Sequence, residues 1–280
     1  TARDVSITLK DGPSKVKARV GVAVQGTGQV TGVLTGLPER LTAGQSAPQD
    51  RVVAARTTQG QPLALEGMRA RTNVGSFTVG APSAGGYAAT IAGESINYPH
   101  VMLVTATGTD GGSASAIVPV FGQVDYPVTA PAGSSVTLVI GDRTFGPVPA
   151  TEQGRATIPI TVPPGVSSAK AMVVKDGQTT EQEIDLPVPD ARRIVGFPLP
   201  EQVSVGEAFP VRVLAVAPDG TPMKDPPTLA VTGGTASELV AQGGGVFAAT
   251  VTPDTAGEVT VDLALPAGGN HADRLTTTAA

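Results

Sequence analysis

The sequence predicts an all-β fold in which β-sandwiches follow one another along the chain, and three observations support this. Apolar and polar residues alternate with the period of a β-strand in several segments, such as 135–140 and 157–162. Turn-forming pairs such as Asp110-Gly111 and Asp219-Gly220 separate these segments, with the spacing of about 8–12 residues that is typical of a sandwich. No window keeps a helical period for three turns, and the nearest one, 63–71, is interrupted by Gly67.

Short segments also recur in the same order further along the chain. Leu37-Pro38-Glu39 returns as Leu199-Pro200-Glu201, about 162 residues later. Matches in a fixed order at a nearly constant offset indicate a tandem array. The other matches pair Arg51-Val52-Val53-Ala54 with Arg212-Val213-Leu214-Ala215, Gly60-Gln61-Pro62 with Gly220-Thr221-Pro222, Leu63-Ala64-Leu65 with Leu229-Ala230-Val231, and Tyr87-Ala88-Ala89-Thr90 with Phe247-Ala248-Ala249-Thr250.

Two types of module, B and A, alternate in this array. We divide the chain into the closing strands of a partial A-type module (1–29), a B-type module (30–122, called B1), a smaller A-type module (123–190, called A) and a second B-type module (191–280, called B2).

The joints between these modules are predicted at 121–127 and 186–190. Both are short and contain proline, which fixes the backbone angle φ and stiffens a connection. The expected arrangement is therefore a rod-like array.

The opening segment resembles only the end of an A-type module, because Lys10-Asp11-Gly12 aligns with Lys175-Asp176-Gly177. Two strands cannot bury a core by themselves. We therefore expect either that a longer natural chain completes this module or that these strands dock on another surface, including a second copy of the chain.

One difference in length separates the two B copies. The stretch from Gly67 to Ala88 is six residues longer than the stretch from Gly233 to Ala248. Loops tolerate insertions, so neutral variation at a loop tip is the simpler interpretation and a functional loop is the alternative.

The composition excludes several classes of function. The chain has no cysteine, which excludes disulfides, thiolate metal sites and cysteine nucleophiles. Its net charge of -5 disfavours nucleic acid, whose binding relies on Lys and Arg. Aromatic residues make up only 3% and there is no Trp, so aromatic ligand platforms are not expected. No apolar stretch approaches the roughly 20 residues of a membrane-spanning helix.

A family resemblance rests on motifs in both module types. The B-type modules carry the Gly60-Gln61-Pro62 turn, the strand Gly85-Gly86-Tyr87-Ala88-Ala89-Thr90 and, in the second copy, Ala256-Gly257 followed by the alternating strand 258–261. These motifs resemble bacterial immunoglobulin-like domains of the invasin and intimin type. The A-type module, with 131–141, 154–159 and Pro163-Pro164-Gly165-Val166, looks like the immunoglobulin-like repeats of large bacterial adhesins. The resemblance implies immunoglobulin-like sandwiches that act as stalk modules or adhesive tips.

The sequence offers no candidate catalytic, cofactor-binding or metal-binding residue. His100 and His271 are the only imidazoles and lie far apart, and His100 ends a turn-like tetrapeptide, 97–100, so a solvent-exposed turn is expected. The Gly-x-Ser-x-Gly, His-Glu-x-x-His and Gly-x-x-x-x-Gly-Lys motifs are absent. The glycine-rich stretches 26–28 and 243–245 are interpreted as turns or bulges, because neither opens onto a helix that would hold a phosphate.

Calcium at the module junctions is the one inorganic ligand that we consider. Calcium needs six to eight converging oxygen atoms, and no Asp-x-Asp cluster occurs. Turn geometry alone explains the Asp-Gly pairs. The oxygen-rich candidates are Asp110, Asp125, Asp142, Asp176, Asp219 and Asp254.

The leading functional hypothesis is a non-enzymatic spacer in a bacterial cell-envelope or surface protein, located outside the cytoplasm. The first alternative is an adhesion or recognition module that binds a protein or glycan through its loops or strand edges. The second alternative is an accessory binding domain of an extracellular enzyme. We expect a protein partner or self-assembly, and neither nucleic acid nor a membrane-spanning segment.

Overall fold

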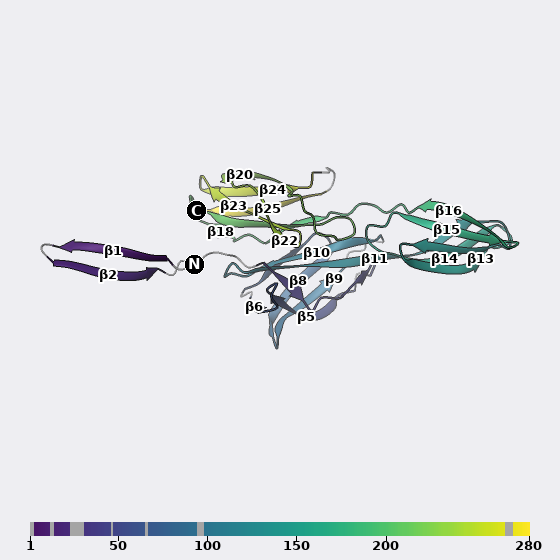
Figure 1. Cartoon of the computed structure of the whole chain (residues 1–280), viewed down its shortest axis with the longest axis horizontal. Coiled ribbons are helices and arrows are strands. Elements are labelled where there is room, and N and C mark those ends of the chain that lie inside the picture. Colours follow the sequence, from purple (N-terminus) through teal and green to yellow (C-terminus); the bar gives the residue numbers. More distant parts are fainter. Residues whose placement is uncertain are drawn as a thin grey trace. The chain divides into compact units, whose positions relative to one another are not determined.

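A computed structural model describes residues 3–11, 14–22, 31–45, 47–64, 67–93, 98–266 and 271–280. Every element of regular structure in these ranges is a β-strand, which confirms the all-β prediction. The chain forms two units, residues 1–30 and residues 31–280 (Figure 1).

The first unit contains a hairpin of β1 (Arg3–Asp11) and β2 (Ser14–Val22). Two strands were expected here, but Lys10 lies opposite Lys15, whereas Lys175 lies opposite Gln178 in module A. The register of this hairpin therefore differs by two residues from that of the A-type hairpin it resembles in sequence. The stretch Gly26-Thr27-Gly28 lies outside the described residues, and docking of these strands stays a prediction.

Module B2 has the strand order of an immunoglobulin sandwich. One sheet runs β17-β19-β23-β21, with β22 also on β23, and the other runs β18-β25-β24-β20. In immunoglobulin lettering these are A-B-E-D and A′-G-F-C. The strands are β17 (Ile194–Gly196), β18 (Gln202–Val203), β19 (Phe209–Ala215), β20 (Thr228–Thr232), β21 (Gly234–Ala236), β22 (Val240–Gly243), β23 (Val246–Pro253), β24 (Gly257–Ala264) and β25 (Ala272–Ala279).

Module B1 has the same topology, with its two layers joined at one edge. Its strands pair in the order β7-β10-β11-β3-β5-β9-β8, that is, C-F-G-A-B-E-D. The first strand, β3, pairs with β11 in parallel and with β5 antiparallel, so it links the layers. The strands are β3 (Thr31–Thr35), β4 (Leu41–Thr42), β5 (Gln49–Arg56), β6 (Pro62–Leu63), β7 (Arg69–Thr72), β8 (Ser76–Ser83), β9 (Gly86–Ala92), β10 (His100–Thr107) and β11 (Ser113–Thr129).

Module A is a smaller sandwich with one wide and one narrow layer. The wide layer runs β13-β12-β15-β16, from β12 (Ser135–Ile140), β13 (Arg143–Pro149), β15 (Ser168–Lys175) and β16 (Gln178–Asp185). The narrow layer pairs the second half of β11 with β14 (Arg155–Val162). This is the immunoglobulin order C′-C-F-G over B-E, without strands A and D.

The narrow layer contains two prolines in its pairing. Pro127 lies opposite Thr157, and Pro159 lies opposite Asp125. The Ala130 N–H donates to the Gly154 carbonyl at 3.0 Å. By the alternation of a strand, the even-numbered residues in this half of β11 point their N–H and C=O groups toward β14. Both prolines consequently face the free edges, where a missing N–H is tolerated.

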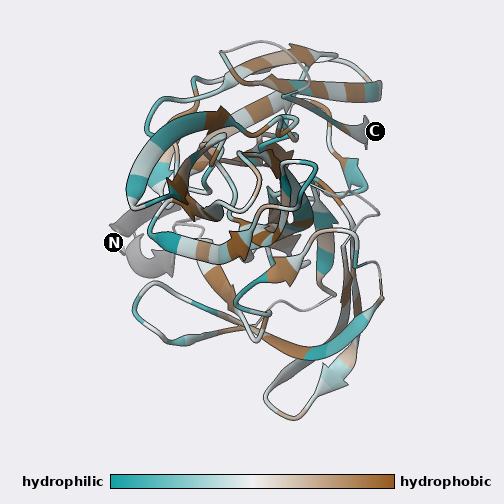
Figure 2. Cartoon of the chain, turned by 90° about the vertical axis from the view of Figure 1, so that its right-hand side faces the viewer, coloured by the Kyte–Doolittle hydropathy of each residue, from teal (hydrophilic) through white to brown (hydrophobic). Residues whose placement is uncertain are grey.

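Three apolar clusters form the cores of the sandwiches. They draw on residues 34–120, 128–186 and 194–279. Figure 2 shows apolar and polar residues alternating along many of the strands. Because successive side chains of a strand point to opposite faces, this alternation gathers the apolar side chains on one face. The described structure thus consists of tandem immunoglobulin-like sandwiches, and our module boundaries remain a proposal.

The stretch 121–127 is not a linker, which corrects the prediction made from its proline and short length. It lies inside β11, whose partner changes from β10, at the pair Val120–His100, to β14, at the pair Gly122–Val162. One continuous strand thus belongs to B1 and to module A. A strand can cross from one sandwich to the next because its backbone finds a new partner without leaving the extended conformation.

Replacing Gly122 with alanine is expected to destabilise this crossing by about 1–3 kcal/mol. A Cβ there would lie 2.7 Å from Pro99 Cδ and 3.2 Å from the Pro99 backbone nitrogen. Gly80→Ala in β8 is the control, because its Cβ would meet nothing closer than 3.5 Å. Thermal unfolding of both variants tests this, and equal stability of the two would contradict it.

The strand pairing also corrects the alignment of the two B copies. Val53 lies opposite Tyr87 and Val213 lies opposite Phe247, so Val53 and Val213 are equivalent. Arg51 therefore corresponds to Val211 rather than to Arg212. A shift of one residue exchanges the two faces of a strand, so Arg51 and Arg212 lie on opposite faces of their strands. Arg51 is exposed, whereas Arg212 is 4% exposed and burial lowers its pKa.

The match of Leu63-Ala64-Leu65 with 229–231 is also wrong. Leu63 belongs to β6, which pairs with β5, while 229–231 belong to β20, which pairs with β24. The equivalent strand of B1 is β7, which pairs with β10. When β7 is aligned with β20, the sequence separation from Thr72 to Tyr87 and that from Val231 to Phe247 differ by a single residue. The six-residue insertion is therefore not present in this part of B1.

Candidate functional site

The two B modules contact each other directly, although module A separates them in the sequence. Strand β10 of B1 faces β17 and β19 of B2 through a fourth apolar cluster, distinct from the three cores. We call it the B1–B2 cluster. The contact departs from a simple row of modules, because the chain passes through module A and returns to B1. The cluster consists of Val101, Leu103, Val195, Phe197, Leu214, Val216 and Val246, with Ile117 packed against it.

This cluster exists because β10 is buried on both faces. Met102, Val104 and Ala106 point into the core of B1, while Val101 and Leu103 point to B2. All residues of β10 but the last are buried. Strands buried on both faces appear as continuous apolar runs. The run Val101-Met102-Leu103-Val104 is therefore a sequence signal of this contact, although it does not alternate.

A buried carboxylate, Asp273 at the start of β25, anchors the polar part of the interface. Its side chain is only 3% exposed. Arg71 of B1 donates from Nη2 to both oxygens at 2.8 and 3.0 Å, the Gly196 N–H donates at 2.7 Å, and Arg192 Nη1 lies 3.6 Å away. Because a buried charge needs such partners, B1 supplies a group that Asp273 of B2 requires.

Further hydrogen bonds cross the same interface. The Asn73 side chain of B1 donates across the interface to the Arg192 carbonyl at 2.5 Å. Within B1 it also donates to the Val101 carbonyl at 2.8 Å and accepts from the Leu103 N–H at 2.7 Å, which holds it in place. Thr105 donates from its hydroxyl to the Gly196 carbonyl at 3.1 Å. Arg69 donates to the Leu199 carbonyl at 2.6 Å. The three bonds to Arg192, Gly196 and Leu199 fix one relative position of B1 and B2, since each needs a particular carbonyl of B2.

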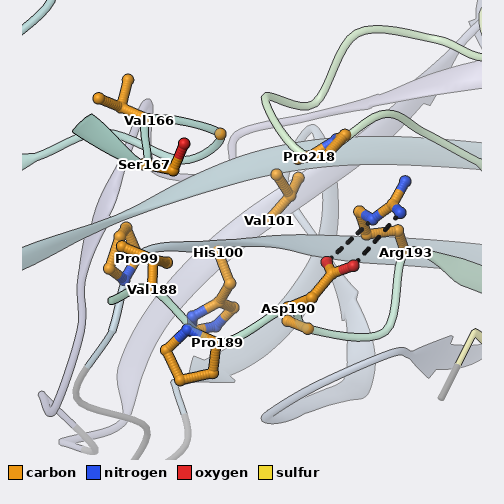
Figure 3. Close-up of a pocket in the computed structure, with 12 residues that line it drawn as sticks. Pro99, His100, Val101, Val166, Ser167, Val188, Pro189, Asp190, Arg193 and Pro218 are labelled. Carbon is orange, nitrogen blue, oxygen red and sulfur yellow. Dashed lines mark hydrogen bonds and ion pairs between the residues drawn. The ribbon is translucent and has the colours of Figure 1, made fainter. Parts of the chain in front are cut away.

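A pocket of about 190 Å³ lies where the three modules meet (Figure 3). Asp190 and Arg193 are its charged residues, and Figure 3 shows the carboxylate of Asp190 turned toward the Arg193 guanidinium. Its walls are mostly apolar. They include Pro99 and Val101 from B1, Val166 from module A, Val188 and Pro189 from the return of the chain, and Pro218 from a turn of B2.

Asp190 holds this return segment to the body of B2. Its carboxylate accepts from Arg193 Nε at 3.2 Å and lies 2.8 Å from His271 Nε2. Burial opposes ionisation of Asp190, but the hydrogen bonds from Arg193 and His271 and the charge of Arg193 outweigh it. The pKa of Asp190 therefore lies below its ordinary value.

The structure corrects the expectation that His100 is a solvent-exposed turn residue. His100 begins β10 and is 4% exposed, and His271 is 5% exposed. His100 Nδ1 lies 2.9 Å from the Tyr98 carbonyl. The sequence places the two histidines far apart, yet His100 lines the junction pocket and His271 contacts Asp190, which also lines it. The fold produces this proximity through the B1–B2 contact, which no local pattern encodes.

Lowering the pH below about 4 is expected to weaken the Asp190 contact. Its pKa is lower in the folded than in the unfolded chain, so the contact stabilises the fold above the ordinary carboxylate pKa, and this stabilisation disappears as the pH falls through the folded-state pKa. Urea unfolding of Asp190→Asn beside the unchanged chain checks this. The difference, about 1 kcal/mol near pH 6, should shrink toward pH 2.5, and a difference independent of pH would contradict it.

The aspartates considered for calcium do not gather in the structure. Among the described residues, no group of three or more His, Asp or Glu side chains is placed to share a metal ion. Asp219 accepts hydrogen bonds from the Thr221 N–H and hydroxyl, both at 2.8 Å, which lower its pKa. Asp110 accepts from the Gly112 N–H at 3.1 Å. Both carboxylates thus close their own turns, and calcium binding stays a prediction.

Comparison with known proteins gives structural likenesses only. No model of a known protein family matches the sequence, and no curated protein matches it. The Escherichia coli adhesin FdeC is similar in structure at 12% identity and a TM-score of 0.30, over 90% of this chain and 97% of that one. Invasin, a bacterial integrin-binding protein, is similar at 15% identity and a TM-score of 0.27, over 89% of this chain and 60% of that one. A three-immunoglobulin titin fragment, I67–I69, is similar at 9% identity and a TM-score of 0.34, over 89% and 98% of the two chains.

These likenesses are low in both identity and TM-score. The assignment of the fold therefore rests on the strand order of the three sandwiches.

Proposed function

We propose that this chain is a non-enzymatic structural segment of a bacterial cell-envelope or surface protein, located outside the cytoplasm. Residues 31–280 act in it as one rigid body of three sandwiches. The observation that carries the proposal is the double connection of the modules. Strand β11 runs through B1 and module A, and the B1–B2 cluster with Asp273 fixes B2 on B1.

The chemistry of the junction supports a structural role. Asp190 is engaged by Arg193 and His271, so its charge is used to hold the return segment in place. Asp273 is likewise engaged by Arg71 and the Gly196 N–H. Within the described residues, no helix is long and apolar enough to cross a bilayer. The resemblance of the sequence motifs to bacterial immunoglobulin-like repeats supports the proposed location.

Distances between spin labels test the rigid body. The chain has no cysteine, so pairs of labels on Thr78→Cys in B1, Lys170→Cys in module A and Thr232→Cys in B2 would be the only ones present. All three positions are exposed. Pulsed electron spin resonance should give one narrow distance distribution for each pair, and a broad distribution for the B1–A or B1–B2 pair would overturn the proposal.

The junction pocket favours a second candidate, the recognition of a protein partner. It combines apolar walls with the carboxylate of Asp190, whose side chain is 55% exposed. Such a combination suits a partner side chain with an apolar stem and a hydrogen-bond donor at its tip. Nuclear magnetic resonance titration with a candidate partner should then shift the amides of Val166, Ser167 and Asp190, and shifts confined to other surfaces would exclude this candidate.

A further inference from the structure

The entry and the exit of residues 31–280 lie at the same end of the B1–B2 pair. Thr31 lies opposite Ser113, which lies opposite Thr107, which in turn lies opposite Arg69. Arg69 contacts Leu199 and Glu201 of B2. The last strand, β25, ends beside the same segment, since the Thr278 N–H donates to Glu201 and the Ala280 N–H donates to Val203.

Module A lies at the opposite end of this pair. Strand β11 begins beside Thr31 and ends in module A. The return from module A passes Asp190, which contacts His271 just before β25 begins. In Figure 1 the label C lies at one end of B2, and β13 to β16 of module A lie beyond the other end. The chain therefore runs out through B1, turns in module A and runs back through B2.

A pull on Thr31 and Ala280 would load the B1–B2 interface from one end. The contacts form successive rows along it, from Arg69 with Leu199, through Arg71 with Asp273 and Thr105 with Gly196, to the junction pocket. When the force acts at one end of an interface, the rows of contacts separate one after another. Each row therefore bears the whole force alone. Each hydrogen bond adds little net stability, because water takes its place when the row opens.

The B sandwiches resist the same pull in a different geometry. In B1 the first strand, β3, and the last, β11, are parallel neighbours. In B2, β18 and β25 are parallel neighbours. A force that pulls the start of the first strand away from the end of the last strand slides the two strands along each other. All hydrogen bonds between the two strands must then break together. The interface is therefore the weaker element along the direction of the pull.

We propose that tension opens the B1–B2 interface before either B sandwich unfolds, so that the folded-back body becomes three sandwiches in series. This inference rests on the proposed function, because a structural segment of a surface protein carries load between its ends. The continuous strand β11 keeps B1 and module A together, and the bend opens at 186–193, between β16 and β17. The opening lengthens the body on the order of 80 Å, given about 3.3 Å per strand residue. Complete unfolding of one B sandwich would release on the order of 300 Å.

Single-molecule pulling with optical tweezers tests this on the full chain. DNA handles attached through Thr31→Cys and Ala280→Cys would be the only thiol-linked ones, because the chain has no cysteine of its own. The expected record shows a reversible step on the order of 80 Å at low force, followed at higher force by the long steps of sandwich unfolding. A record in which sandwich unfolding is the first event overturns the proposal.

Interface variants show whether the early step is this opening. Asp273→Asn is expected to raise the opening rate at least tenfold, whereas Asp262→Asn, which removes an exposed partner of Arg274 in the same module, should change it less than twofold. Thr105→Val, which removes only the hydroxyl donor to Gly196, gives a second test if Asp273→Asn does not fold. An early step insensitive to both interface variants overturns the proposal. If the spin-label distances are narrow at zero force but the pulling record has no early step, the opening under tension is rejected and the rigid body stands. If the spin-label distances are broad, the rigid body itself is rejected.

Discussion

Replacing Asp273 with asparagine is expected to weaken the docking of B2 on B1 and to lower the free energy of unfolding by about 2–3 kcal/mol. The carboxylate is 3% exposed, while Arg71 and Arg192 are 35% and 33% exposed. Removing one member of a buried ion pair leaves its partners without a counter-charge, and the partial exposure of the two arginines places the effect at the lower end of the usual range. Asparagine keeps the size of the side chain and one oxygen for the Gly196 N–H, so the variant tests the charge rather than the packing.

Two measurements check this expectation. Urea unfolding followed by circular dichroism gives the change in free energy, and the spin-label distance between Thr78→Cys and Thr232→Cys reports the position of B2 on B1. The matched control is Asp262→Asn, whose ion pair with Arg274 is exposed and should matter little. A B1–B2 distance that stays narrow in Asp273→Asn would show that the carboxylate does not hold the interface.

Replacing Phe197 with alanine is expected to lower the free energy of unfolding by about 3–4 kcal/mol. The ring is 2% exposed within the B1–B2 cluster, so alanine removes buried apolar surface and leaves a cavity between the modules. The loss should appear first as weaker docking of B2 on B1. The measurements are urea unfolding and the same pair of spin labels.

The control for this variant is the same substitution at a different place. Phe247 is 0% exposed and lies in the core of B2 itself. Phe247→Ala should lower stability by a similar amount, about 3–4 kcal/mol, yet B2 should remain docked on B1 until it unfolds. If both variants broaden the B1–B2 distance equally, the apolar cluster has no separate role in docking.

The strands were predictable because each one carries its own periodic signal. The alternation over 135–140 and 157–162 corresponds to β12 and to most of β14. The hairpin turns at Asp110-Gly111 and Asp176-Gly177 were predictable because the conformation of a turn depends on a few adjacent residues.

The arrangement of the modules was not predictable in this way. It depends on contacts between residues about 200 positions apart, such as Arg71 with Asp273, and no local pattern records which face meets which. The alignment of the copies failed for a related reason. Leu63-Ala64-Leu65 and 229–231 are similar in sequence, but β6 and β20 pair with different strands. Only the pairing distinguishes a strand of one layer from a strand of the other.

The two prolines of the narrow layer of module A have a consequence for the behaviour of this protein at high concentration. A two-stranded layer has two open edges, and an open edge ordinarily recruits strands from other molecules. Pro127 and Pro159 face those edges. A strand from another molecule that pairs there meets a proline ring in place of a backbone N–H donor, so continuous hydrogen bonding is interrupted at both edges. Module A can therefore keep an unusually thin layer in a crowded environment without becoming a seed for β-sheet polymers.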